Sequence, residues 1–215
     1  MSNITQSMFS KDVEVKSKKS IHDGFCSVKN YEMRQKYFDG GWSEPYIREF
    51  VAKPHAVAAL PYDPKLDKVV LIEQLRPGAI DAAEQNEMDT PWLIEIVAGI
   101  VEEKYKGSHK DFIKQEILEE TGLEAKAFLH MYDYFTSPGC STERIELFCA
   151  RVDSTKAKEF AGLREEQEDI KVHVISTKEA FLALHAGQIN NAAAIIALQW
   201  LDLNMNIIHQ QWGVE

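Results

Sequence analysis

The chain has 215 residues and a formal net charge of −10, from 24 Lys and Arg against 34 Asp and Glu, and 45% of its residues are hydrophobic. This is the composition of an ordinary globular protein, and a chain of this length can bury a substantial core without disulfides. The acidic balance excludes general binding to nucleic acid, and the longest apolar run, residues 192–198, is far below the roughly 18 residues of a membrane-spanning helix.

Residues 1–53 are predicted to form a small antiparallel β subdomain. In its middle segment Phe25, Tyr31, Met33 and Tyr37 have the same parity, so a strand places them on one face. The predicted strands are residues 13–18, 25–38 and 46–52.

Residues 54–215 are predicted to form a second domain in which strands and helices are mixed, which gives an α+β fold. The helix over 109–121 ends before Gly122, a residue that readily adopts the left-handed conformation of a helix end. The predicted strands are 55–63, 68–76, 127–135, 145–152 and 170–175, with a further apolar segment at 92–99, and the other predicted helices are 178–186 and 191–204.

Cysteine and histidine usage narrows the class of protein. The three cysteines are an odd number without C-x-x-C spacing, which argues against a secreted disulfide framework and favours a reducing, cytoplasmic location. The seven histidines show no H-E-x-x-H or paired spacing, so each is expected to be structural or exposed. The glycine patterns of P-loop, dinucleotide-binding and serine-hydrolase sites are absent from the sequence.

Three carboxylates share one stripe of the predicted helix over 109–121. Glu116, Glu119 and Glu120 are spaced i, i+3 and i+4, so their side chains are neighbours. Because like charges at this spacing destabilise a helix, and because Mg²⁺ prefers oxygen ligands, the stripe is a candidate magnesium site.

The segment around these glutamates resembles the Nudix box, in which a glycine and a loop glutamate precede the helical motif Arg-Glu-aliphatic-x-Glu-Glu-x-Gly-aliphatic. Residues 116–123 read E-I-L-E-E-T-G-L, and Gly99 follows the apolar segment WLIEIVA. The interval from Gly99 to Glu116 is two residues longer than in the pattern, Gln115 stands in place of its arginine, and Tyr105 or Gly107 stands in place of its first glutamate.

The resemblance extends over roughly residues 12–201 and is greatest to the bacterial ADP-ribose pyrophosphatases among the Nudix hydrolases. It includes the segments TPWLIEIVAG, SPGCSTER and GLREEQEDIKVHVIS, and Pro138 lies 15 residues after Leu123, a cue for ADP-ribose as substrate. It implies a Nudix α/β/α sandwich with a mixed sheet. It also implies a homodimer that cleaves ADP-ribose to AMP and ribose 5-phosphate with Mg²⁺, or Mn²⁺ as an alternative.

Carried over position by position, the resemblance also implies site residues. The metal ligands would be the Ala98 carbonyl, Glu116, Glu120 and Glu168. Glu119 and Glu120 would be catalytic together with Glu166 as general base, although the flexible loop leaves the choice among Glu165, Glu166 and Glu168 open. The implied substrate-binding residues are Arg48 and Arg76 for the diphosphate, Ser137 and Glu143 for the terminal ribose, and Phe9 or Tyr31 for the base.

Two alternatives stay open at this point. The first is a pyrophosphatase for another nucleoside diphosphate sugar, such as GDP-mannose. The second is a catalytically weak ADP-ribose-binding protein, which the replacement of the box arginine by Gln115 and the missing loop glutamate would favour.

Overall fold

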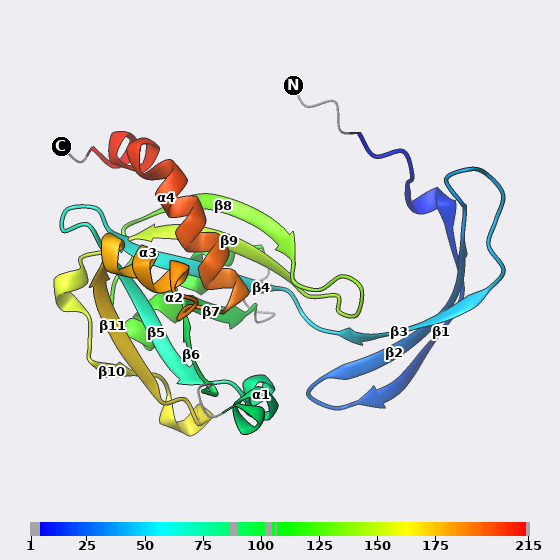
Figure 1. Cartoon of the computed structure of the whole chain (residues 1–215), viewed down its shortest axis with the longest axis horizontal. Helices are drawn as coiled ribbons and strands as arrows, with labels where there is room; N and C mark the ends of the chain where they lie inside the picture. Colours follow the sequence, from blue (N-terminus) through cyan, green and yellow to red (C-terminus); the bar gives the residue numbers. More distant parts are fainter. Residues whose placement is uncertain (1–4, 87–89, 102–104, 106, 214–215) are drawn as a thin grey trace. The chain divides into compact units, whose positions relative to one another are not determined.

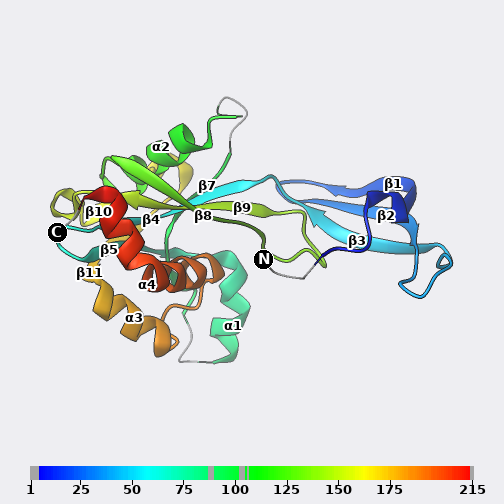
Figure 2. The same cartoon turned by 90° about the horizontal axis from the view of Figure 1, so that it is seen from above.

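The protein is represented by a computed structural model that describes residues 5–86, 90–101, 105 and 107–213. The chain divides into two compact units (Figure 1 and Figure 2). Unit 1 comprises Met1–Pro54 and Phe135–Glu143, and unit 2 comprises His55–Tyr134 and Arg144–Glu215. The predicted domains, 1–53 and 54–215, differ from these units in the placement of the 135–143 segment.

Unit 1 is a three-stranded antiparallel sheet of order β1-β2-β3. The predicted middle strand begins two residues later than expected, and Phe25 lies in the preceding turn with its side chain exposed. The 135–143 segment joins this unit because the Val51 amide donates a hydrogen bond of 2.8 Å to the Cys140 carbonyl. The strands are β1 (Val13–Asp23), β2 (Ser27–Gln35) and β3 (Tyr46–Ala52), and a 3₁₀ turn, η1 (Ser10–Asp12), precedes them.

Unit 2 contains a mixed sheet of order β10-β11-β5-β4-β9-β8, with β6 paired to β5 and β7 paired to β4. The sheet is mixed because β4 runs parallel to β9 and antiparallel to β5 and β7. Its strands are β4 (Ala56–Asp63), β5 (Lys68–Leu75), β6 (Trp92–Glu95), β7 (Val97–Ile100), β8 (Ala127–Phe135), β9 (Arg144–Arg151), β10 (Phe160–Ala161) and β11 (Ile170–Ser176). Its helices are α1 (Ile80–Gln85), α2 (His109–Thr121), α3 (Thr177–His185) and α4 (Ala192–Trp212).

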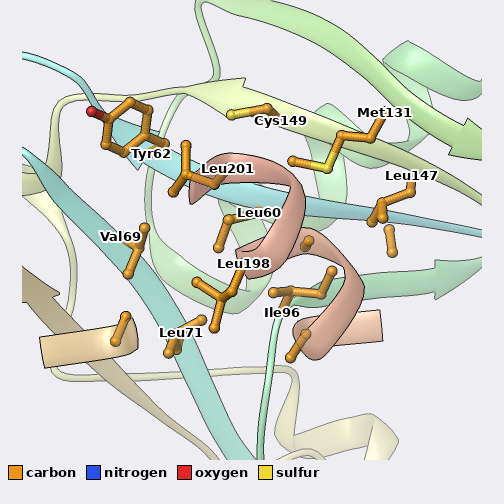
Figure 3. Packing of buried hydrophobic residues seen from close by; sticks show 14 of the residues in the cluster. Leu60, Tyr62, Val69, Leu71, Ile96, Met131, Leu147, Cys149, Leu198 and Leu201 are labelled. Atoms are coloured by element: carbon orange, nitrogen blue, oxygen red, sulfur yellow. The ribbon is translucent and has the colours of Figure 1, made fainter. Parts of the chain in front are cut away.

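Both faces of this sheet are covered by helices. Successive residues of a strand point to opposite faces, so Leu60 and Tyr62 of β4 pack into a core with α3 and α4, whereas Val57 and Ala59 pack into a second core with α2. Figure 3 shows the first core, in which Leu198 of α4 lies among residues from several strands. The predicted α/β/α sandwich with a mixed sheet is confirmed.

Two features of unit 2 differ from the expected elements. The apolar segment 92–99 forms two strands, β6 and β7, which pair with different neighbours. Helix α4 continues past Asn204 because Ile208 and Trp212 are buried on its core face, and the Asn204 amide donates to the Trp200 carbonyl at 2.7 Å. Within the described part of the chain, no helix combines the length and apolar character that crossing a bilayer requires.

Candidate active site

The glycine and the first helix glutamate of the box meet in space. A Cβ atom added to Gly99 on β7 would lie 2.7 Å from Cδ of Glu116 and 2.7 Å from Cζ of Phe112, both on α2. Only glycine permits such a close approach of strand and helix. The two extra box residues fall between β7 and α2, where residues 102–104 and 106 lie outside the described residues, and they leave this contact intact.

Glu120 is the buried carboxylate of the group, with only 3% of its surface exposed. The Ala98 backbone donates a hydrogen bond to it, but among the described residues its Oε2 atom has no hydrogen-bond partner. Burial, followed by the negative charges of Glu116 and Glu168, raises the pKa of Glu120 well above its usual value. A buried oxygen without a partner, beside two further carboxylates, is an arrangement that a divalent cation would stabilise.

Glu168 reaches this group from the loop that follows a 3₁₀ turn, η5 (Arg164–Glu166). Its Oε2 accepts a hydrogen bond of 3.3 Å from the Leu163 amide, and the Gly162 amide donates to the Glu119 carbonyl at 3.3 Å. The loop is therefore attached to α2 at the level of the glutamates. Glu166 is exposed in η5, so its role as general base stays a prediction.

Gln115 occupies the position of the box arginine. Its Nε2 donates a hydrogen bond of 2.5 Å to Oε1 of Glu119. A neutral amide thus provides a donor that orients this carboxylate, without the positive charge that a guanidinium would bring.

Arg76 follows β5 and is held by a buried carboxylate. Its Nε and NH2 groups lie 2.8 Å and 2.7 Å from Oε2 of Glu95, which also accepts from Gln74, while Asn191 donates to the other oxygen. The positive charge of Arg76 lowers the pKa of Glu120, so the guanidinium lies close enough to act on the carboxylate group. The structure therefore brings this predicted phosphate-binding residue together with the predicted metal ligands.

A pocket of about 420 Å³ lies beside these groups in unit 2. Its lining includes the carboxylates Glu119 and Glu168 and the cations Lys158 and Arg164. In a chain with a net charge of −10, such cations favour the approach of an anionic ligand.

The other three predicted substrate-binding residues lie in unit 1. Arg48 stacks over the Tyr46 ring at 4.4 Å and lines a pocket of about 380 Å³ together with Tyr31. Ser137 Oγ lies 3.3 Å from Cys140 Sγ, and Glu143 pairs with Lys53 at 3.3 Å. The neighbours of these residues are thus described within unit 1, and their roles stay predictions.

Sequence reasoning missed Glu95 and Gly162. Glu95 is a single carboxylate within the apolar segment 92–99, and a charge in an otherwise buried strand signals a paired or functional group. Gly162 has a positive φ of 90°, and an added Cβ would lie 3.0 Å from the Glu168 Cβ. No pattern in the sequence indicates that approach.

Comparison with known proteins identifies the family. No protein-family model matches the chain. The ADP-ribose pyrophosphatase of Haemophilus influenzae is 41% identical over 201 residues, which is 94% of this chain and 91% of the relative. The chain belongs to the ADP-ribose pyrophosphatase family. A second ADP-ribose pyrophosphatase, from Escherichia coli K12, is 40% identical over 202 residues, with 94% and 93% of the two chains covered.

Two further relatives set the ADP-ribose pyrophosphatase family in context. A GDP-mannose pyrophosphatase of Cronobacter sakazakii is 30% identical over 195 residues, covering 89% of this chain and 96% of the relative. A crystal structure of an ADP compounds hydrolase has a TM-score of 0.69 and 14% identity, covering 95% and 98% of the two chains, and so shares the fold. The predicted family, the fold and the assignment as a hydrolase are confirmed.

Proposed function

We propose that this chain hydrolyses the pyrophosphate bond of ADP-ribose to AMP and ribose 5-phosphate. The observation that carries the proposal is the buried Oε2 of Glu120, which lacks a partner among the described residues and lies beside Glu116 and Glu168. The relatives at about 40% identity are named for this reaction, which supports ADP-ribose as the substrate.

The proposed cofactor is Mg²⁺, with Mn²⁺ as an alternative. Its ligands would be Glu116, Glu120, Glu168 and the Ala98 carbonyl, a set of oxygens that suits a hard cation. When bound, the ion supplies positive charge that stabilises the pyrophosphate oxygens during displacement at phosphorus. The raised pKa of Glu120 supports this assignment, because a cation would favour the charged form that burial disfavours.

The side chains of the chain itself would perform the remaining steps. Arg76, oriented by Glu95, would bind a phosphate oxygen of the substrate. Glu166 would accept a proton from the water that attacks phosphorus, and its position on an exposed turn allows it to approach a bound substrate. Glu119, oriented by Gln115, would complete the negative surface of the metal site.

Unit 1 is proposed to complete the substrate site and to form a homodimer. Arg48 would contact the diphosphate, and Ser137 and Glu143 the terminal ribose. Phe38 and Ile47 are 86% and 61% exposed, which supports burial of this sheet against a second copy. A mass of one chain in light scattering during gel filtration, instead of two, would remove the dimer. The three free cysteines support a cytoplasmic location.

The test is release of AMP from ADP-ribose with Mg²⁺, with EDTA as blank. GDP-mannose is run in parallel because a relative at 30% identity bears that name. Fast, EDTA-sensitive cleavage of ADP-ribose supports the proposal, whereas preferential cleavage of GDP-mannose replaces it with the second candidate. Binding of ADP-ribose without turnover would show that Gln115 cannot replace the box arginine.

A further inference from the structure

A second group of potential metal ligands lies outside the carboxylate site. His130 and Asp133 of β8 and Glu146 of β9 present ligand atoms that all lie within 4.8 Å of one another. We propose that this group binds Zn²⁺ or a chemically similar transition metal ion. The site is separate in composition from Glu116, Glu120 and Glu168, and it does not depend on the proposed reaction.

The spacing of the ligand atoms suits such an ion. Nε2 of His130 lies 3.4 Å from Oδ2 of Asp133. Two ligands bound tetrahedrally at the usual Zn–N and Zn–O distances are separated by roughly 3.3 to 3.5 Å. The side chains of His130 and Asp133 are 46% and 54% exposed, so an ion can reach them from solvent.

Neighbouring groups already hold the ligands in position. Nδ1 of His109 lies 2.5 Å from Oε2 of Glu146, and a ligating carboxylate that is itself hydrogen-bonded is the usual arrangement in metal sites. The His130 ring contacts the Phe148 ring edge-on, with centroids 5.6 Å apart. These supports distinguish the group from a patch of solvated acidic residues.

The donor types determine the metal. One imidazole nitrogen and two carboxylates favour Zn²⁺, Co²⁺ or Ni²⁺, whereas Mg²⁺ prefers oxygen ligands and retains its waters. The two carboxylates would contribute two negative charges. They act against the ammonium of Lys110, which lies 6.0 Å from the centroid of the same Phe148 ring.

The topology gives such an ion a structural consequence. Ligation would connect β8 with β9 and, through His109, with the first residue of α2, the helix that carries the box glutamates. Glu146 pairs with Val57 of β4, which pairs on its other side with Gly99. A metal here would therefore stabilise the neighbourhood of the carboxylate site without supplying any of its ligands.

The experiment measures Co²⁺ and Zn²⁺ binding to the full chain by visible absorption and calorimetry. It is done in Glu120→Gln so that the catalytic carboxylates contribute least. One equivalent should bind, with the absorption spectrum of four-coordinate Co²⁺. Adding His130→Gln or Asp133→Asn should weaken binding more than tenfold, and adding His109→Gln should weaken it by about tenfold to a hundredfold.

The matched control is His173→Gln. His173 also pairs with a glutamate, Glu73, at 2.8 Å, but Lys171 lies 3.8 Å from that carboxylate instead of a third ligand. This variant should bind as its parent does. Unchanged binding in both His130→Gln and Asp133→Asn, or loss of all binding in Glu120→Gln, overturns the proposal. With Mg²⁺, His130→Gln in the otherwise native chain should retain ADP-ribose hydrolysis, so failure of either proposal is seen separately.

Discussion

Replacing Glu120 by glutamine should stabilise the metal-free protein while removing its activity. Glu120 is 3% exposed, and its Oε2 faces other carboxylates without a partner among the described residues. A buried polar group without its hydrogen bond costs about 1–3 kcal/mol. For a chain of this size each kcal/mol shifts the melting temperature by about 2–4 °C, so we expect a rise of about 2–12 °C in EDTA at neutral pH.

The pH dependence follows from the direction of the pKa shift. Because the pKa of Glu120 is raised in the folded state, folding retains its proton, and the stability of the metal-free protein declines as pH rises from the unfolded towards the folded pKa. The advantage of the glutamine variant should therefore be small in acid and complete above the folded pKa. Exposed Glu124, changed to glutamine, is the matched control and should show neither effect.

The assay is thermal unfolding by circular dichroism in EDTA across a pH series, repeated with Mg²⁺. A hundredfold excess of ion over its dissociation constant should stabilise the native chain by about 2.7 kcal/mol and the glutamine variant far less. Turnover of ADP-ribose should fall by several orders of magnitude in Glu120→Gln. A variant that melts below the native chain in EDTA at every pH, or that keeps more than a tenth of the activity, would refute the ligand assignment.

Three further changes test other parts of the structure. Gly99→Ala places a Cβ 2.7 Å from Glu116, so activity should fall and stability should drop by about 1–3 kcal/mol; an unchanged rate of AMP release would contradict the close approach. Glu95→Gln weakens the ion pair that orients Arg76, so steady-state kinetics should show a raised KM, and an unaltered KM would argue against that role. Ile117→Ala removes a fully buried side chain and should cost about 2–5 kcal/mol in urea unfolding, whereas a loss below 1 kcal/mol would contradict the packing of α2.

Local patterns predicted the elements that carry their own signals. Helix α2 has the expected bounds because its apolar residues have helical spacing and Gly122 ends it with a φ of 75°. The end of α4 was wrong because Asn204 was taken as a boundary, although the burial of Ile208 and Trp212 decides it. The division of 92–99 into β6 and β7 depends on which strands lie beside it, and that information is not local.

The candidate site shows the same limit. Spacing alone places Glu116, Glu119 and Glu120 on one stripe of α2, but it does not say which of them is buried. The structure selects Glu120 because β7 covers that part of the helix, and it turns Glu119 towards Gln115. Glu95, which orients Arg76, could not be predicted because its partners come from Gln74, Arg76 and Asn191, three separate places in the sequence.

The contact between Gly99 and Glu116 also bears on how this family tolerates change in length. The two residues are fixed by packing between β7 and α2, so the number of residues that connect them is free to differ. A search that requires a fixed interval would overlook chains such as this one, whereas a search for a glycine strand against a glutamate helix would find them. The same connection is a suitable place to insert a short peptide tag, since neither end of it has to move.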